Sequence, residues 1–320
     1  MHRGRYIWRR TLFALVTVFV AVTINFLLFR VLPGSAANRL SRVPGASAEM
    51  KATLERQFGI DKPLWEQYLL YLKGLFTGNL GISFSNRQPV AANLAEAFLN
   101  TLPLVLSGTI IALAIGITLG ILSAVRRGTI FDHAMTNISV VFYAFPTQFV
   151  GAMLLIFFAG VLPSAGMADP FAIALSPGEQ FADRLRHLIL PVATLALTLY
   201  AEYLLIMRSS VLETLGEDYV LTARAKGLPR GRIIRSYSVR NAMLPTVTMV
   251  ALALGTVVSG AILIEVIYSW PGIGRELYQA VLQRDYPMLQ GGFLVITITV
   301  VVFNYLADLA YAWLDPRVSD

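Results

Sequence analysis

TLPLVLSGTIIALAIGITLGILSAV, residues 101–125, carries no charged side chain. A helix needs about 20 mainly apolar residues to cross the hydrocarbon core of a bilayer, so this stretch is long enough to span a membrane. Working outward from it, the sequence offers six such stretches: residues 11–31, 101–125, 134–162, 187–207, 244–267 and 291–314. Pro146 and Pro191 interrupt the third and the fourth. Membrane helices tolerate such prolines where neighbouring groups bond the freed carbonyls.

The overall composition agrees with a membrane protein. Of the 320 residues, 56% are hydrophobic and 14% are charged, whereas soluble domains have about 45–50% apolar and about 25% charged residues. Cysteine is absent, which excludes disulfides, thiol chemistry and a cysteine–zinc site. The net charge of +7 suits anionic lipid and membrane orientation better than nucleic acid. We therefore expect an all-α polytopic membrane protein with six transmembrane helices and a helical external segment between the first two.

Positive charge sets the expected orientation. Basic residues gather in segments 3–10, 126–127, 208–240 and at Arg317, and with six spans all four fall on one side. Because cytoplasmic loops carry the excess of Lys and Arg, both termini should lie in the cytoplasm and the protein in the cytoplasmic (inner) membrane. Gly34-Ser35-Ala36 could end a cleaved signal peptide. The apolar run before it exceeds the usual signal core of about 7–15 residues, so we expect a retained span.

Two short helices are expected in the external segment. Ser47 is a candidate N-cap for the first, which Gly59 would stop. Pro63 opens the second, which runs to Gly78 with Trp65, Tyr68, Leu72 and Phe76 on one stripe. The segment is either a cap over the outer ends of the spans or a docking surface for an external partner, and these interpretations are compatible.

The inner segment 208–243 contains one more predicted helix. Asp218 lies at its start, and Gly227 and Pro229 stop it. Tyr219, Ala223 and Lys226–Gly227 share a face with small residues at its centre, which would allow close approach by another protein. The alternative is a basic amphipathic helix on anionic lipid, and composition alone favours that alternative.

The motifs of this segment resemble a known family. DYVLTARAKGL (218–228) followed by RNAMLP (240–245) resembles the cytoplasmic loop of membrane subunits of type I ABC importers, and most closely the first permease of the dipeptide/oligopeptide/nickel family. The general loop reads Glu-Ala-Ala, three residues, Gly, and later Leu-Pro. Here Leu221-Thr222-Ala223 replaces the triplet, while Gly227 and Leu244-Pro245 keep their places. The missing Glu departs from the general motif and matches the peptide branch.

Three other parts of the chain support the same resemblance. They are PLWEQYLLYLKGLFTGNLGISFS (63–85), HLILPVATLAL with RSSVLE (187–197 and 208–213) and EVIYSWPGIGRELYQAVLQRDYPMLQG (265–291). The resemblance implies a permease that forms half of a translocation pathway for peptides, with a second permease, two ATPase subunits and an external binding protein as partners. It leaves the exact solute open, among dipeptides, oligopeptides, nickel chelates and other small molecules.

The resemblance also implies residue roles and a division of the chain. Contact with the ATPase is expected from Tyr219, Ala223, Arg224, Lys226, Gly227, Leu228 and Pro245. The first span and the external segment would occupy residues 1–93. The transmembrane core with its coupling loop would occupy 94–314, and a cytoplasmic tail 315–320.

Several kinds of chemistry have no matching motif. The chain has no G-x-x-x-x-G-K-[ST] loop, so ATP and Mg would bind on the partner ATPase subunits, with no cofactor on this chain. Pro271-Gly272-Ile273-Gly274 does not have the dinucleotide spacing and predicts a tight turn before a re-entering helix. The three histidines lie far apart, so no metal site is expected. We predict no catalytic residues and no enzymatic activity.

Two acids lie inside predicted spans, where a charge costs about 2.5–3.5 kcal/mol on insertion scales. Glu202 is a candidate for the wall of a translocation path, and Asp308 reads more simply as a paired structural acid. Gly116 and Gly120 present a small face that lets helices approach closely, by default within the chain. Two rivals remain: an ion-coupled transporter using one of the acids as proton carrier, and a membrane-embedded enzyme, which would need converging catalytic groups.

Overall fold

The computed structural model describes residues 2–31, 62–243, 246 and 261–314. The described residues form helices joined by short turns, with one isolated bridge between Ile82 and Pro89. The chain divides into two compact units, each described by itself. Unit 1 comprises Met1–Thr101 with Pro271–Asp320, and unit 2 comprises Leu102–Trp270. The border falls inside helix α5, one residue before Pro103.

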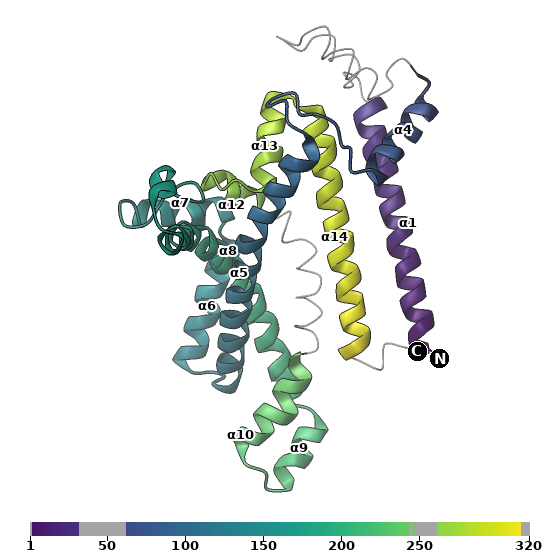
Figure 1. Ribbon diagram of the computed structural model, residues 1–320. Coiled ribbons are helices and arrows are strands. Elements are labelled where there is room, and N and C mark those ends of the chain that lie inside the picture. Colours follow the sequence, from purple (N-terminus) through teal and green to yellow (C-terminus); the bar gives the residue numbers. More distant parts are fainter. Residues whose placement is uncertain (1, 32–61, 244–245, 247–260, 315–320) are drawn as a thin grey trace. The chain divides into compact units, whose positions relative to one another are not determined.

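Unit 1 contains helices from both ends of the chain. They are α1 (His2–Val31), α4 (Leu64–Phe76), the start of α5 (Val90–Val125), α13 (Ile273–Gln283) and α14 (Tyr286–Leu314). The first and the last of these, α1 and α14, lie side by side along their length (Figure 1). The first helix of the chain is therefore packed against the last one.

Polar contacts join α1 to α14 at both ends. Near the amino end of α1, Arg10 Nη1 lies 3.2 Å from Asp308 Oδ2, so Asp308 is a paired acid whose partner is Arg10, and neither Asn304 nor a residue of a partner subunit has to be invoked. At the other end, Asn25 Nδ2 donates to the carbonyl oxygen of Gln290 at 3.0 Å. Because such pairs need matching positions along both helices, they fix the register of the two helices.

Helix α4 begins directly after Pro63, as predicted from the sequence. Tyr68 joins it to α1 through a hydroxyl contact of 2.7 Å with Thr23. The predicted apolar stripe does not face inward along its whole length, because Trp65 is 64% exposed and Phe76 is 91% exposed. The other predicted external helix, from Ser47 to Gly59, lies outside the described residues.

The turn between α13 and α14 is organised by a buried acid. Asp285 is 1% exposed and accepts hydrogen bonds from Ser83 Oγ at 2.5 Å, from the Ser85 amide at 3.1 Å and from the Met288 amide at 3.2 Å. The bond from Met288 caps the start of α14, and the two from the serines hold the 83–85 turn. The predicted turn at 271–274 is also present, since α13 begins at Ile273.

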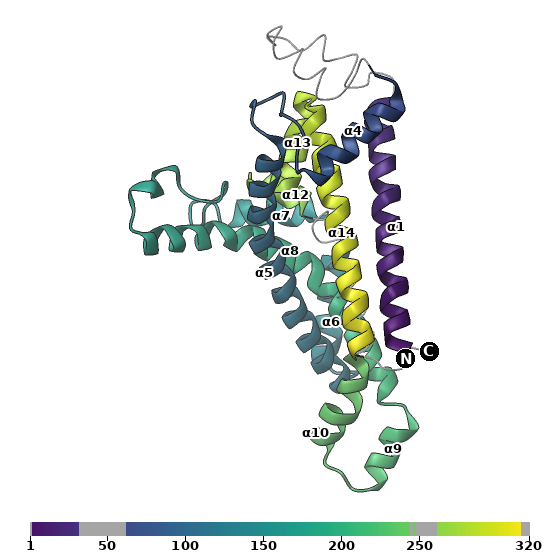
Figure 2. The same cartoon turned by 45° about the vertical axis from the view of Figure 1, so that its right-hand side comes forward.

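Unit 2 contains the rest of α5 and the elements up to Trp270. They are α6 (Ile130–Ala144), α7 (Thr147–Phe157), η1 (Pro170–Ala174), α8 (Pro177–Thr214), α9 (Asp218–Ala225), α10 (Arg230–Arg232), η2 (Ile233–Val239) and α12 (Ile262–Ile267). In Figure 2 the first part of α8 extends sideways, and the rest runs down to α9 and α10. The short helices α9 and α10 thus follow the end of the longest helix of the unit.

The two prolines predicted to interrupt spans behave differently. At Pro146 the chain breaks into α6 and α7, which are bent by 105°. Pro191 lies inside α8 without dividing it. Proline removes one backbone hydrogen bond in either case, so the surrounding packing decides whether a helix continues.

Small residues bring α5 into close contact with α8. A Cβ added to Gly116 would lie 2.6 Å from Tyr203 Cβ, and one added to Gly120 would lie 2.8 Å from the Leu204 carbonyl oxygen. Gly108 meets the Leu195 side chain in the same way. The small face predicted on span two is therefore used inside the chain, as expected for close helix packing in membranes.

Four described helices are long and apolar enough to cross a membrane, and the bent pair α6–α7 would make a fifth. The predicted fifth span, 244–267, lies mostly outside the described residues, which include only Thr246 and residues 261–267 of it. The chain is an all-helical polytopic membrane protein.

Candidate functional site: the loop between α8 and η2

Helix α9 ends in a complete C-terminal capping motif. Gly227 has φ +73°, the Gly227 amide donates to the Arg224 carbonyl at 2.9 Å, and the Leu228 amide donates to the Ala223 carbonyl at 3.3 Å. These two bonds make a Schellman motif, which needs a left-handed residue after the helix and is usually completed by glycine. The predicted short, sharply stopped helix is therefore confirmed, and its direction is fixed by backbone bonds.

The loop has a small hydrophobic core of its own. Val220, Ala223 and Ile233 are each at most 4% exposed, with Leu228 and Tyr237 packed against them. Ala223 is 3% exposed and packs against Ile233 of η2 in this chain, and its predicted contact with the ATPase stays a prediction. Spacing alone assigned Ala223 to the face of Tyr219, because the sequence did not reveal that the following turn folds back over it.

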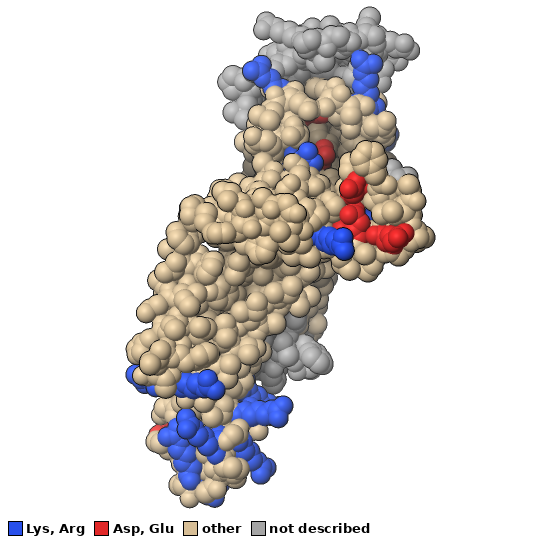
Figure 3. All heavy atoms as spheres, turned by 90° about the vertical axis from the view of Figure 1, so that its left-hand side faces the viewer, with Lys and Arg blue, Asp and Glu red and all other residues tan. Residues whose placement is uncertain are grey.

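Both apolar and basic side chains are exposed on α9, although Tyr219 and Leu221, two residues apart, lie on different sides of the helix. Leu221 is 51% exposed and Tyr219 is 37% exposed. Arg224 and Lys226 are exposed beside them. Figure 3 shows the blue side chains gathered at this end, and the exposed basic residues there include Arg224, Lys226, Arg230, Arg232, Arg235 and Arg240. Exposed apolar side chains amid cations are typical of a surface that a partner covers.

A cavity of about 470 Å³ lies on the other side of the loop. Arg224 and Arg230 line it together with apolar residues of the loop and with Val125 at the end of α5. Arg230 Nη2 also donates to the Val125 carbonyl at 3.1 Å. The loop is therefore tied to the end of α5 as well as to α8.

Hydrogen bonds also join the loop to α8. Thr214 Oγ1 lies 2.6 Å from Ser238 Oγ, and Ser238 Oγ is 3.4 Å from the Val211 carbonyl oxygen. Both ends of the loop are thus connected near the end of α8. These contacts, together with the chain itself, connect α9 and η2 to α8.

An ion pair of Arg208, which lies about one turn before Val211 on α8, was not predicted from the sequence. Arg208 Nε lies 2.6 Å and Nη2 lies 2.8 Å from the two carboxylate oxygens of Asp132, which is 1% exposed. Gly128 and Thr136 also donate to this carboxylate, at 3.0 and 3.5 Å. The available signal was an acid in the first turn of α6 and an arginine at the end of an apolar run, but 76 residues separate them and sequence gives no distance between them.

The remaining predicted site residues are located as follows. Glu202 lies within α8 and is half-buried, next to the buried Tyr203. Pro245 lies outside the described residues. No group of three or more His, Cys, Asp or Glu side chains in the described part of the chain is arranged to hold a metal ion.

Long apolar helices and a rigid basic loop at the end of α8 define the class: a multi-pass membrane subunit of the permease type. The chain belongs to the family of binding-protein-dependent transport system inner membrane components. The model of that family matches residues 116–320. The model of its amino-terminal region, described as a binding-protein-dependent transport system membrane component, matches residues 3–105.

Curated relatives match nearly the whole chain. The dipeptide transport system permease protein DppB of Escherichia coli K12 is 39% identical, over 97% of this chain and 97% of its own length. The di/tripeptide transport system permease protein DppB of Pseudomonas aeruginosa is 36% identical over 98% of both chains. A dipeptide permease DppB of Alkalihalophilus pseudofirmus is 34% identical over 97% of this chain. The resemblance to the first permease of the peptide branch of type I ABC importers is thereby confirmed, and the chain is a transport subunit, not an enzyme.

Proposed function

We propose that this chain is the permease subunit of an ATP-driven, binding-protein-dependent importer of di- or oligopeptides. It forms half of the translocation pathway together with a second permease, and it couples to separate ATPase subunits that carry ATP and Mg. The names of the relatives support peptides as the solute. The six-span topology with both termini in the cytoplasm belongs to the same proposal and is supported by the distribution of basic residues.

The observation that carries the coupling part is the exposed apolar pair Leu221 and Tyr219 on a helix whose direction is fixed. A protein partner gains free energy by burying these side chains, whereas a purely electrostatic contact with lipid would not need them. ATP binding can shift the permease between two conformations only if the contacts between ATPase and permease differ in the two. The docked helix must therefore be rigid enough to carry that difference into the permease. The Schellman stop and the loop core supply that rigidity.

Glu202 contributes to the pathway part of the proposal. Its half-buried position on α8 suits a polar wall, since an acid inside a membrane protein should face a cavity or a partner. The adjacent Tyr203 is packed at the close contact between α8 and Gly116, which holds this turn of α8 in place.

Reconstitution tests the proposed function directly. The chain is co-expressed with the second permease and ATPases encoded beside it, and the complex is placed in proteoliposomes with the cognate binding protein outside. Uptake of a labelled dipeptide is expected only with ATP inside. Uptake driven by a proton gradient without ATP would contradict the proposal.

The coupling surface is tested by Leu221→Asp in the same complex. Loss of a central apolar contact is expected to weaken ATPase association about tenfold or more and to abolish uptake. Ser236→Asp is the matched control, because it adds the same charge to another exposed position of the loop. If the loop merely binds anionic lipid, the two variants would have equal, mild effects, and that result would refute docking through α9.

A further inference from the structure

The cavity of about 470 Å³ beside the loop between α8 and η2 has two different kinds of wall. Its charged side is formed by Arg224 and Arg230, and no acid is among the described residues that line it. Its apolar side is formed by side chains from the end of α5, the end of α8 and the loop itself: Val125, Leu215, Leu228, Ile233 and Ile234. Such a cavity suits a ligand that is anionic at one end and apolar at the other.

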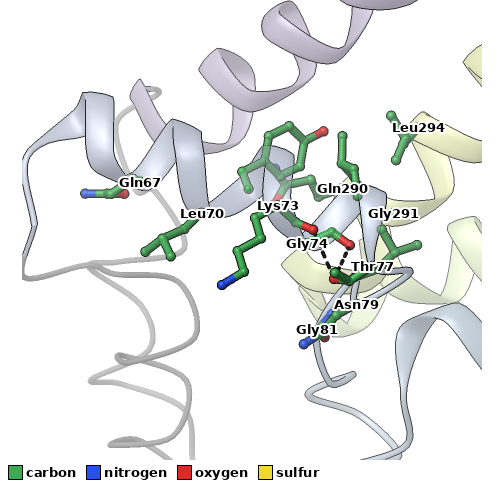
Figure 4. Close-up of a pocket in the computed structure, with 13 residues that line it drawn as sticks. Gln67, Leu70, Lys73, Gly74, Thr77, Asn79, Gly81, Gln290, Gly291 and Leu294 are labelled. Atoms are coloured by element: carbon green, nitrogen blue, oxygen red, sulfur yellow. Dashed lines mark hydrogen bonds between the residues drawn. The ribbon is translucent and has the colours of Figure 1, made fainter.

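A smaller cavity in unit 1 lacks this combination. It has a volume of about 280 Å³, and Figure 4 shows Thr77 at its edge bonded to the carbonyl groups of Lys73 and Gly74. Gln67 and Asn79 of its wall are also bonded within the chain. Lys73 is the one charged side chain among the described residues that line it. The loop cavity therefore makes the stronger demand for a ligand.

The two arginines of the loop cavity have hydrogen-bond donors to spare. In the described part of the chain neither Arg224 nor Arg230 forms an ion pair. Arg230 uses Nη2 for the Val125 carbonyl at 3.1 Å, and a guanidinium carries five N–H donors. This bond also holds the Arg230 side chain in place before a ligand arrives, which lowers the entropic cost of binding. Guanidinium groups match phosphate and carboxylate oxygens in pairs.

The depth of the cavity follows from the same bond. Residues 97–125 carry no charged side chain, and Arg126 and Arg127 follow directly. Basic residues at the end of such a run mark the boundary of the hydrocarbon core. Because Arg230 donates to the last carbonyl of the run, its guanidinium lies at that boundary, next to the layer of lipid phosphate and ester groups.

Charges on the neighbouring helices agree with this depth. Asp132, at the start of α6, accepts a hydrogen bond from the Gly128 amide at 3.0 Å and is paired with Arg208 of α8. The amide of Gly128 is only three residues beyond Val125. The first charged side chains at this end of α5, α6 and α8 are thus close together, which defines one level for the boundary in unit 2.

An anionic phospholipid combines both requirements at this depth. A free phosphate would pair with the arginines and leave the apolar side of the cavity in contact with water, which is unfavourable. An acidic side chain of a protein partner would have to reach the membrane boundary between α5 and the loop. A lipid brings its phosphate and its apolar part to that level without any such reach.

We propose that this cavity binds an anionic glycerophospholipid of the leaflet on the side of the loop. The phosphodiester accepts hydrogen bonds from Arg224 and Arg230, and the glycerol region with the first methylene groups covers Val125 and Ile234. The bound lipid adds a second connection between the loop and α5, beside the hydrogen bond of Arg230. Binding requires neither the solute nor the ATPase, so it is independent of the function proposed above.

Native mass spectrometry of the purified full-length chain tests the proposal. The chain is titrated with dioleoyl phosphatidylglycerol and, as a lipid of the same acyl chains without net charge, with dioleoyl phosphatidylcholine. Arg230→Gln is expected to weaken the most tightly held phosphatidylglycerol about tenfold, because charge-assisted hydrogen bonds are lost. Arg224→Gln, at an exposed position, is expected to weaken it about fivefold. Binding of phosphatidylcholine should change little.

Two further variants separate the cavity from its surroundings. Arg235→Gln is the matched control, since it removes the same charge from an exposed position of the loop outside the cavity. It is expected to weaken phosphatidylglycerol about twofold or less. Ile234→Ser removes part of the apolar wall and is expected to weaken the lipid about threefold, whereas an anion alone would not depend on this side chain.

The remaining outcomes would overturn the proposal. Equal losses in Arg224→Gln, Arg230→Gln and Arg235→Gln would show a diffuse attraction between the basic loop and the membrane. Displacement of the lipid by inorganic phosphate, with no effect of Ile234→Ser, would show a site for a free anion. Displacement by the purified ATPase would show that the cavity belongs to a protein interface. None of these results would affect ATP-dependent peptide uptake as a test of the transport function.

Discussion

Gly227 is the residue on which the geometry of the loop between α8 and η2 depends most. Its φ of +73° is unfavourable for every residue with a Cβ, and a Cβ there would otherwise meet nothing within 4 Å. Its contribution is therefore conformational, with no packing component. Gly231, four residues further on, also has open space around it but no left-handed backbone.

Gly227→Ala is expected to strain the stop of α9 by about 1–2 kcal/mol and to lower co-purification of the ATPase together with uptake. Gly227→Asn should retain more activity, because asparagine tolerates the left-handed conformation. Gly231→Ala provides the comparison, since it adds the same methyl group without the strain. Equal ATPase co-purification and equal uptake in Gly227→Ala and Gly231→Ala would show that the left-handed turn has no role in coupling.

For single residues, the sequence predicted the backbone conformation better than it predicted the packing around the side chain. Gly227 and Pro229 predict a stop because their conformational preferences are local. The burial of Ala223 depends on Ile233, ten residues later, and on the path of the turn between them. For the same reason the sequence did not single out Leu221, which is 51% exposed on α9.

At the scale of elements, the Asp132–Arg208 pair joins the start of α6 to the last turns of α8. Only Asp132 is fully buried, and Arg208 is 25% exposed, so removing Asp132 leaves a partly solvated charge and costs less than breaking a fully buried pair, which costs about 3–5 kcal/mol. The pair therefore stabilises the packing of α6 against α8 in unit 2.

Asp132→Ala is expected to lower the thermal stability of the purified chain markedly and to reduce coupling of ATP hydrolysis to uptake. Glu66→Gln, which breaks the exposed pair with Lys62, should cost only about 0.3–0.5 kcal/mol. Unfolding followed by scanning fluorimetry distinguishes the two variants. Similar small shifts in both would mean that the Asp132–Arg208 pair adds no more than a surface contact.

Elements were predicted where the sequence carries a strong local signal. The long apolar runs gave α1, α5, α8 and α14, and Gly116 with Gly120 indicated close packing. The break at Pro146 and the continuity at Pro191 could not be distinguished, because both prolines lie in apolar runs and only the neighbouring helices differ. Nothing in the sequence indicated that Gln67 would be the buried residue of α4.

For the whole molecule, the orientation in the membrane stays a prediction that the cysteine-free sequence makes easy to test. Gln88 is exposed before α5, and Ser236 is exposed in η2. A cysteine at Gln88 should react with an impermeant thiol reagent in intact spheroplasts, and one at Ser236 only after the membrane is opened. Reaction of Ser236→Cys from outside would reverse the topology and remove the basis for ATPase coupling.

The assembly of unit 1 from both ends of the chain has a consequence for biosynthesis. α1 leaves the ribosome first, but Gln290 and Asp308, which bond Asn25 and Arg10, belong to the last helix. At about 5–20 residues per second, synthesis of the chain between Val31 and Tyr286 takes about 13–50 s. Asn25 can already bond Tyr71 of α4 during that time, whereas Arg10 has no contact with Asp308 until α14 has been synthesised.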